Sequence, residues 1–172
     1  VRDETVDKLK RDLKSRKSQL QKYAAEYYNV LQKTVLVVGT EKRDRFEIVR
    51  KGLKTQVKVY QIENGKESLI SEREFLARET NELWIYGLGG EDVYKVSGNG
   101  KKPKIRLLGG PDNDSYEVPT SKRIRIYDFK SKENNIGLAA KSALRLSDSY
   151  DVNTYNYEKA KYNYFAGTPI IG

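Results

Sequence analysis

Acidic side chains occur within glycine-rich, turn-like stretches in the second half of the chain. The stretch "GGPDNDSYE" carries Asp112 and Asp114, and the stretch "GLGGEDVYK" carries Asp92. Calcium takes six to eight oxygen ligands, mainly from carboxylates and from the backbone carbonyls of such turns. A calcium site formed by these three aspartates is therefore one interpretation of the sequence.

Both stretches resemble the nonapeptide calcium repeat of secreted RTX proteins, G-G-x-G-x-D-x-U-x. The first departs from the repeat at Asp112 and the second at Leu88, where glycine is expected. A related stretch around Asp44, "GTEKRD", is too basic for a cation site. The residues favour the alternative, a metal-free turn in which each aspartate accepts hydrogen bonds from the amides of its own turn. Calcium remains the second interpretation, and no other cofactor is indicated.

One spacing pattern places these aspartates in a repeat. Each copy has a short apolar strand, a glycine, four residues, an aspartate, any residue, an aromatic residue, any residue and a β-branched residue. Three copies carry it: Gly39, Asp44, Phe46 and Ile48; Gly87, Asp92, Tyr94 and Val96; Gly109, Asp114, Tyr116 and Val118. A fourth copy opens with Asp128 in the glycine position.

The steps between copies suit the coils of a solenoid. Gly109 follows Gly87 by 22 residues and Asp128 follows Gly109 by 19, lengths that fit one strand–turn–strand coil of a β-solenoid or β-roll. By the two-residue period of a strand, the aromatic and β-branched residues of each copy should point inward. The glycines are expected to supply positive φ where strand becomes turn.

The elements that position this repeat begin with a helix. Residues 1–33 are predicted to form an amphipathic basic helix packed on the β region, with Asp3 as its N-cap. Its apolar side chains fall at spacings of three, four and seven: Val6, Leu9, Leu13, Leu20, Ala24, Tyr27 and Leu31. The lysine-rich face is expected to lie in water, and contact of this face with anionic lipid or nucleic acid is the alternative.

Residues 34–146 are predicted to form a β-rich repeat domain. The strand-like segments are "TVLVVG", "DRFEIV", "QVKVYQI", "LWIYG", "DVYKV", "KIRLLG", "SYEV" and "RIRIYD". Asn64-Gly65 predicts a hairpin over residues 55–76, inserted between the first two copies of the repeat. The expected fold class is mainly β with an N-terminal helix (α+β), a short β-solenoid-like stack. Residues 147–172, rich in Tyr and Asn, are predicted to be an extended tail.

Composition excludes several kinds of active site. The chain of 172 residues has no His and no Cys, so a Ser-His-Asp site, an imidazole metal site and thiolate chemistry are all excluded. No apolar run approaches the roughly 20 residues that span a bilayer. The chain does not begin with Met, which predicts that it starts inside a longer gene product or after processing. A net charge of +9 is compatible with nucleic acid, anionic lipid or an acidic partner.

The order of these segments resembles the middle region of a family of large Gram-negative outer-membrane proteins. The resemblance is carried by "LKSRKSQLQKYAAEYYNVL", "VVGTEKRDRFEI", "LWIYGLGGEDVYKV", "IRLLGGPDNDSYEV" and "IRIYDF". In that family a calcineurin-like metallophosphoesterase domain precedes this region, and a surface-antigen type transmembrane β-barrel follows it. The tail "YNYFAGTPIIG" resembles the approach to the first barrel strand, with Gly172 as a boundary.

The resemblance implies a non-catalytic structural or interaction domain on the periplasmic side of the outer membrane. Its implied partners are the phosphoesterase and barrel domains of the same polypeptide. The metal-binding positions of the family's phosphoesterase need His, which this chain lacks, so none of them carries over.

Two other functions are less favoured. A basic groove with stacking tyrosines would suit nucleic acid, but no known binding pattern is present and the repeat tyrosines are expected to point inward. A glycan-cleaving enzyme needs two carboxylates about 5 to 9 Å apart in an open groove. Asp112 and Asp114 are close enough in sequence for this, but they lie in a turn without an evident cleft.

Overall fold

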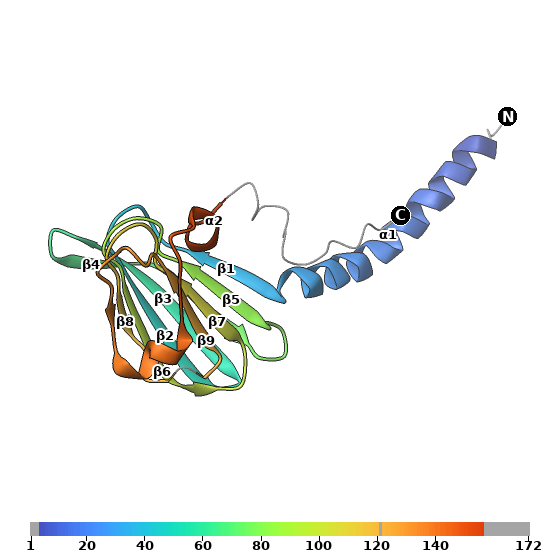
Figure 1. Ribbon diagram of the computed structural model, residues 1–172. Coiled ribbons are helices and arrows are strands. Elements are labelled where there is room, and N and C mark those ends of the chain that lie inside the picture. Colours follow the sequence, from blue (N-terminus) through green and yellow to red (C-terminus); the bar gives the residue numbers. More distant parts are fainter. Residues whose placement is uncertain (1–3, 121, 157–172) are drawn as a thin grey trace. The chain divides into compact units, whose positions relative to one another are not determined.

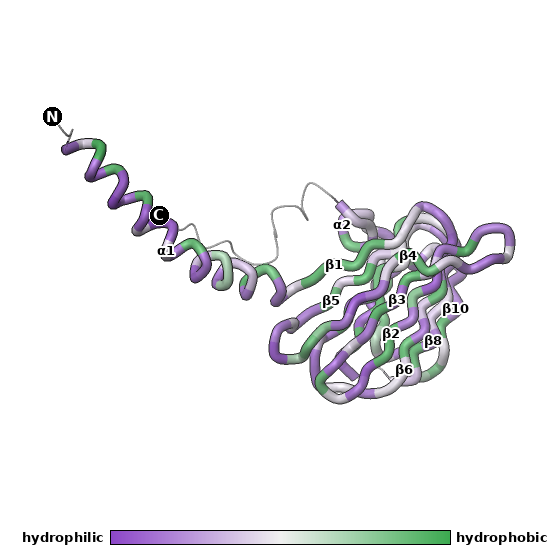
Figure 2. The backbone as a smooth tube through the Cα atoms, turned by 180° about the vertical axis from the view of Figure 1, so that it is seen from behind, coloured by the Kyte–Doolittle hydropathy of each residue, from purple (hydrophilic) through white to green (hydrophobic). Residues whose placement is uncertain are grey.

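The structure is a computed structural model that describes residues 4–120 and 122–156 (Figures 1 and 2). The chain divides into two compact units, residues 1–33 and residues 34–172. Each unit is described by itself. No helix in the described part of the chain is long and apolar enough to cross a bilayer.

The first unit contains one helix, α1, from Glu4 to Leu31. The helix confirms the sequence prediction, and it follows from 28 consecutive residues without Gly or Pro. Glu4 and Asp7 lie in its first turn, where they complement the positive end of the helix dipole. None of its residues is buried. The predicted packing of α1 on the β region stays a prediction, and the predicted N-cap, Asp3, lies outside the described residues.

The second unit contains a five-stranded parallel sheet and a six-stranded mixed sheet. The parallel sheet has the order β1 (Thr34–Val38), β5 (Glu82–Tyr86), β7 (Lys104–Leu108), β9 (Ile124–Asp128) and β11 (Leu144–Leu146). The mixed sheet has the order β10 (Asn135–Ile136), β8 (Ser115–Glu117), β6 (Val93–Gly100), β2 (Asp44–Gly52), β3 (Lys54–Glu63) and β4 (Lys66–Leu76).

Successive strands of the repeat alternate between the two sheets. The first strand of each copy lies in the parallel sheet and the second in the mixed sheet, so equivalent residues of neighbouring copies pair in parallel. Phe46 lies beside Tyr94, and Tyr94 beside Tyr116. The mainly β prediction is thereby confirmed at the level of two sheets after an N-terminal helix. The described residues show no closed or solenoid sheet.

The hairpin predicted over residues 55–76 is confirmed: β3 and β4 span residues 54–76. β3 and β4 pair antiparallel around Asn64 and Gly65, both with positive φ (52° and 73°), as the Asn-Gly pair predicts. A second antiparallel connection, between β2 and β3 at Gly52, was not predicted. The two connections extend the mixed sheet on the side of β2 away from β6 (Figure 1).

The core lies between the inward faces of the two sheets. The aromatic and β-branched residues of all three repeat copies are buried, as predicted: Phe46, Ile48, Tyr94, Val96, Tyr116 and Val118. The 3₁₀ helix η1 (Leu138–Ala143) adds two buried alanines to this core, Ala140 and Ala143.

The segment after β11 is partly folded. Instead of continuing in extended form, it makes a short helix, α2 (Tyr150–Asn153). Tyr150 packs edge-on against Phe129, and Tyr155 packs edge-on against Tyr86. The rest of the predicted tail, from residue 157, lies outside the described residues.

Candidate functional site

The aspartates of the repeat form a hydrogen-bonded column. The backbone N–H of Asp44 donates to Oδ1 of Asp92 at 2.7 Å, and that of Asp92 donates to Oδ1 of Asp114 at 2.8 Å. The backbone N–H of Asp114 donates to Oδ1 of Asn134 at 2.7 Å. These four residues (the turn column) therefore bind each turn to the next one, through the side chains of Asp92, Asp114 and Asn134.

This arrangement differs from the predicted one. Asp44 does accept a hydrogen bond from its own turn, from the Thr40 N–H at 2.5 Å. The backbone donors to Asp92 and Asp114, by contrast, come from the preceding copy of the repeat, 48 and 22 residues away. The aspartates are therefore ties between turns as well as parts of a single turn.

Asp92 and Asp114 have strongly raised pKa values. Asp92 and Asp114 are fully buried, and Oδ2 of each has no hydrogen-bond partner among the described residues. Burial is the main cause that raises the pKa of Asp92 from 3.8 to about 9 and that of Asp114 from 3.8 to about 8. Neighbouring carboxyl groups raise both values further, against the opposing effect of the amide hydrogen bonds. The raised pKa values favour the uncharged form of both side chains at neutral pH.

Asn134 shows what an uncharged side chain does in this position. Its Oδ1 accepts the Asp114 N–H, and its Nδ2 donates to the Phe129 carbonyl oxygen in its own turn at 3.3 Å. An uncharged aspartic acid has the same pattern of one acceptor and one donor. The last member of the turn column thus shows that an uncharged side chain can accept the amide of the preceding turn in this position.

The repeat glycines are needed for space and not for positive φ. Gly39, Gly87 and Gly109 are not among the glycines with positive φ, so the expectation from the sequence was wrong. A Cβ at Gly39 would lie 2.6 Å from Oδ2 of Asp44 and 2.7 Å from the ring of Phe46. At Gly87 and Gly109, the aspartate and tyrosine of the same copy would obstruct a Cβ in the same way. Glycine, aspartate and aromatic ring are one packing unit.

The aromatic rings form a second column beside the turn column. Phe46 stacks on Tyr94 with ring centroids 4.8 Å apart, and Tyr94 stacks on Tyr116 at 5.0 Å. The Tyr94 hydroxyl donates to the Leu108 carbonyl at 2.8 Å. The Tyr116 hydroxyl donates to Oδ2 of Asp128 at 2.6 Å. No tyrosine of this column is exposed for base stacking.

Asp128 lies at the end of the column of aromatic rings. It occupies the glycine position of the fourth copy, and the residue that pairs with Tyr116 in that copy is Ile136, which has no ring to fill the space. The Asp128 side chain is fully buried and also accepts the Phe129 N–H at 2.6 Å. Burial raises its pKa from 3.8 to about 6.

The three aspartates proposed for calcium are not grouped as metal ligands in the described part of the chain. Oδ2 of Asp112 accepts the Gly90 N–H at 2.8 Å, so Asp112 also ties two turns together. Among the described residues, no group of three or more His, Cys, Asp or Glu side chains is arranged to hold a metal ion. Asp114 is also too buried to act on a glycan. Calcium binding by Asp92, Asp112 and Asp114 stays a prediction.

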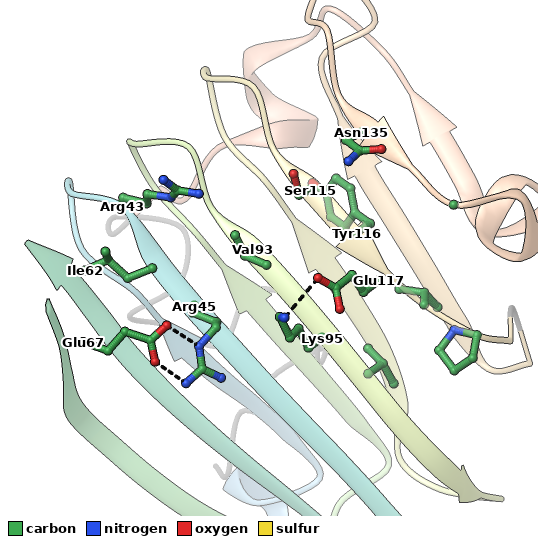
Figure 3. A pocket seen from close by; sticks show the side chains of 14 residues that line it. Arg43, Arg45, Ile62, Glu67, Val93, Lys95, Ser115, Tyr116, Glu117 and Asn135 are labelled. Carbon is green, nitrogen blue, oxygen red and sulfur yellow. Dashed lines mark hydrogen bonds and ion pairs between the residues drawn. The ribbon is translucent and has the colours of Figure 1, made fainter. Parts of the chain in front are cut away.

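An open trough of about 810 Å³ crosses the outer face of the mixed sheet (Figure 3). Short side chains, Val93, Ser115 and Asn135, lie along one row of β6, β8 and β10, between longer charged ones. Arg45 donates two hydrogen bonds to Glu67, at 2.8 and 2.6 Å. Lys95 pairs with Glu117 at 3.1 Å.

A buried arginine, Arg50, lies near the end of β2 that is opposite to Asp44. The Arg50 side chain is 2% exposed and donates to the carbonyl oxygens of Gly100 at 2.5 Å, Lys122 at 3.2 Å and Pro103 at 3.3 Å. Its Nε has no partner among the described residues. Burial and the charge of Arg123 lower its pKa. Arg50 thus ties the connection between β6 and β7 to the loop between β8 and β9 through their backbone carbonyls.

Sequence reasoning missed Arg50, Asn134 and the trough. Arg50 lies two residues after Ile48 and four after Phe46, so the two-residue period of the strand places it on the buried face. This period could have identified it from the sequence. Asn134 lies six residues after Asp128, whereas in the other copies the aspartate lies five residues after the glycine. The fixed spacing of the repeat therefore did not include Asn134. The trough depends on which strands become neighbours, which the local sequence does not specify.

Comparison of the chain with protein-family models, with characterised proteins and with solved structures finds no match.

Proposed function

We propose that this chain is a non-catalytic structural and interaction module, built as a short β-solenoid-like stack of turns. The observation that carries the proposal is the turn column. The acidic groups that a catalytic or metal site would use accept hydrogen bonds from the amides of neighbouring turns, and Asp92 and Asp114 are also fully buried. Their chemistry supports the stack and is not directed at a ligand.

Rigidity along the stack supports a spacer role. Each turn is tied to the next by parallel strand pairs in both sheets, by the turn column and by the stacked rings. A bend between two turns would break several of these contacts together. Such a stack transmits position from one end to the other, which is what a connecting domain requires.

The trough supports an interaction role. Four of its five charged side chains are paired, Arg45 with Glu67 and Lys95 with Glu117, and only the exposed Arg43 is outside these pairs. This surface suits a polar protein segment better than a polyanion, because nucleic-acid contacts rely on cations that are available to phosphates.

In the setting that the sequence resemblance implies, the module connects a phosphoesterase domain to an outer-membrane barrel in a cell-envelope protein. Residues 34–146 would hold these two domains apart on the periplasmic side. The lipid-facing and nucleic-acid-facing roles of the basic helix are weaker alternatives, since neither has a specific contact to support it.

Amide hydrogen exchange followed by NMR tests the rigid-stack part of the proposal. The amides of Asp44, Asp92 and Asp114 are expected to exchange at one common rate set by global unfolding. If each turn opened at its own much faster rate, the module would be a flexible linker and the spacer role would be refuted.

A charge exchange tests the interaction part. In the longer protein, the double change Lys95→Glu with Glu117→Lys keeps the ion pair and its strand positions but inverts the surface. We expect it to weaken contact between the module and its neighbouring domain in crosslinking, while the melting temperature is unchanged. The matched control is Lys54→Glu with Glu74→Lys, an exposed pair outside the trough at 2.9 Å. Equal crosslinking in both variants would remove the trough from the proposal.

A further inference from the structure

The exposed face of α1 has the period of a coiled coil. Large apolar or aromatic residues fill seven of eight positions that recur at alternating intervals of three and four. These eight positions (the helix seam) are Val6, Leu9, Leu13, Arg16, Leu20, Tyr23, Tyr27 and Val30. The pattern repeats every seven residues without a break over four heptads, and a strict seven-residue repeat favours a left-handed supercoil with another helix.

Within the described residues of its own unit, nothing covers the helix seam. Leu9, Leu13, Leu20 and Tyr27 are each between 56 and 64% exposed. A helix that packs on a sheet needs a stripe with a period of 3.6 residues, whereas this seam keeps the 3.5-residue period that faces a second helix along its whole length. Most of the stability of helices in proteins comes from packing of an amphipathic face, so a partner that covers this face would stabilise α1.

The single charged member of the seam indicates how two copies would meet. In a parallel pair, each Arg16 would lie opposite Arg16 of the second copy, and like charges would meet in the apolar seam. In an antiparallel pair, Arg16 lies opposite Leu20 of the second copy, Leu13 opposite Tyr23, and Leu9 opposite Tyr27. The parallel pair would gain an exposed attraction between Asp12 and Lys17, but exposed ion pairs contribute little.

We infer that α1 is a self-association element: the helix seam of one chain pairs with the helix seam of a second copy in an antiparallel coiled coil. The basic residues flank this seam or lie on the outer faces, so the association is apolar in origin. The inference is independent of the proposed spacer function, because it rests on the first unit alone, and it gives that module a dimeric state.

Sedimentation equilibrium of the whole chain tests this inference. The unmodified chain is expected to be a dimer that persists when salt is raised, because apolar contacts are not screened. Leu20→Asp is expected to weaken association by at least about tenfold, since it places a charge in the seam of both copies. Ala25→Asp introduces the same charge on the outer face of the same helix and is expected to leave association unchanged.

A gain-of-function variant separates pairing from mere helix damage. Arg16→Leu completes the seam and is expected to tighten association by about tenfold or more. A chain that stays monomeric at high concentration, or an Arg16→Leu variant that associates no more tightly than the unmodified chain, would overturn the inference.

Disulfide trapping tests the orientation. The chain has no cysteine, so introduced ones react only with each other. Mixing Leu13→Cys with Tyr23→Cys is expected to give the mixed disulfide. Preferential trapping of Leu13→Cys with itself would overturn the antiparallel arrangement. Neither result depends on the trough or the turn column, so failure here leaves the proposed function standing.

Discussion

Replacing Asp114 with Asn should stabilise the protein at neutral and alkaline pH. The change removes a carboxyl group whose pKa is about 8 when folded, against 3.8 ordinarily. Asn keeps the acceptor for the Asp92 N–H and supplies a permanent donor in place of the acid proton, as Asn134 does one turn further along. The folded state would no longer have to hold a proton that the unfolded chain releases.

The sign and the size follow from proton linkage. Because the folded pKa lies above the unfolded one, the folded state binds the extra proton, and stability falls as pH rises from about 4 to about 8. The loss is at most about 1.4 kcal/mol per pH unit for one carboxyl. Over the three units between pH 4 and pH 7 the upper limit is about 4 kcal/mol, and local relaxation reduces it. We expect Asp114→Asn to add about 1 to 3 kcal/mol at pH 7 and to add little at pH 4.5.

Urea unfolding at several pH values measures this effect. Trp84 is the single tryptophan, and its ring packs under the guanidinium of Arg106, 4.6 Å from the ring centroid, so its fluorescence should report unfolding. Asp112→Asn is the matched control, because it removes the same charge from the same turn at a partly exposed position. It should not add stability. An Asp114→Asn variant with the same pH dependence as the unmodified protein would refute the reasoning, and so would one that is less stable at every pH.

Three further predictions concern the turns and the loops. Thermal melting in about 5 mM calcium and in EGTA should give the same midpoint if the turn column is metal-free, whereas a rise of several degrees that Asp92→Ala and Asp114→Ala abolish would establish the calcium interpretation. Gly87→Ala should cost about 2 to 3 kcal/mol in urea unfolding, because its Cβ would lie 2.5 Å from the Gly109 carbonyl oxygen. Gly137→Ala is the control and should be close to neutral, because its Cβ would lie 3.8 Å from the nearest atom, the Tyr116 carbonyl oxygen. Arg50→Met should lower the free energy of unfolding by about 2 kcal/mol or more, because three backbone carbonyls lose their donor and this loss outweighs the relief of a buried charge. A variant as stable as the unmodified protein would show that the guanidinium does not hold the loops.

Local patterns predicted the elements well. The period of the N-terminal segment predicted α1, Asn64-Gly65 predicted the hairpin between β3 and β4, and the alternation in each repeat copy predicted which residues are buried. All of these depend on contacts between residues that are near in sequence. The inserted hairpin also accounts for the one long step in the repeat, since β3 and β4 extend the sheet on the far side of β2.

The chemistry of the aspartates could not be predicted in the same way, because their partners lie in other turns. The same Gly-x4-Asp-x-aromatic spacing fits a calcium ligand, a carboxylate that accepts an amide of its own turn, and an acid that accepts an amide of the preceding turn. What distinguishes them is the depth at which Asp92 and Asp114 are buried and the origin of the amide that each one accepts, 48 and 22 residues earlier in the chain.

The residues that change in the fourth copy of the repeat indicate which interpretation of the aspartates is favoured. Where the column meets its last turn, Asn replaces Asp and one residue is added; where the ring stack ends, Asp128 replaces glycine and Ile136 replaces the aromatic residue. These substitutions make sense if the interior positions are held by packing and by amide hydrogen bonds, because an amide side chain can serve in an acid's place there. A column of calcium ligands would lose charge by the same substitution. The sequence difference between Asp114 and Asn134 therefore favours uncharged acids in the turn column, and the pH dependence of the Asp114→Asn variant is the direct test of that reading.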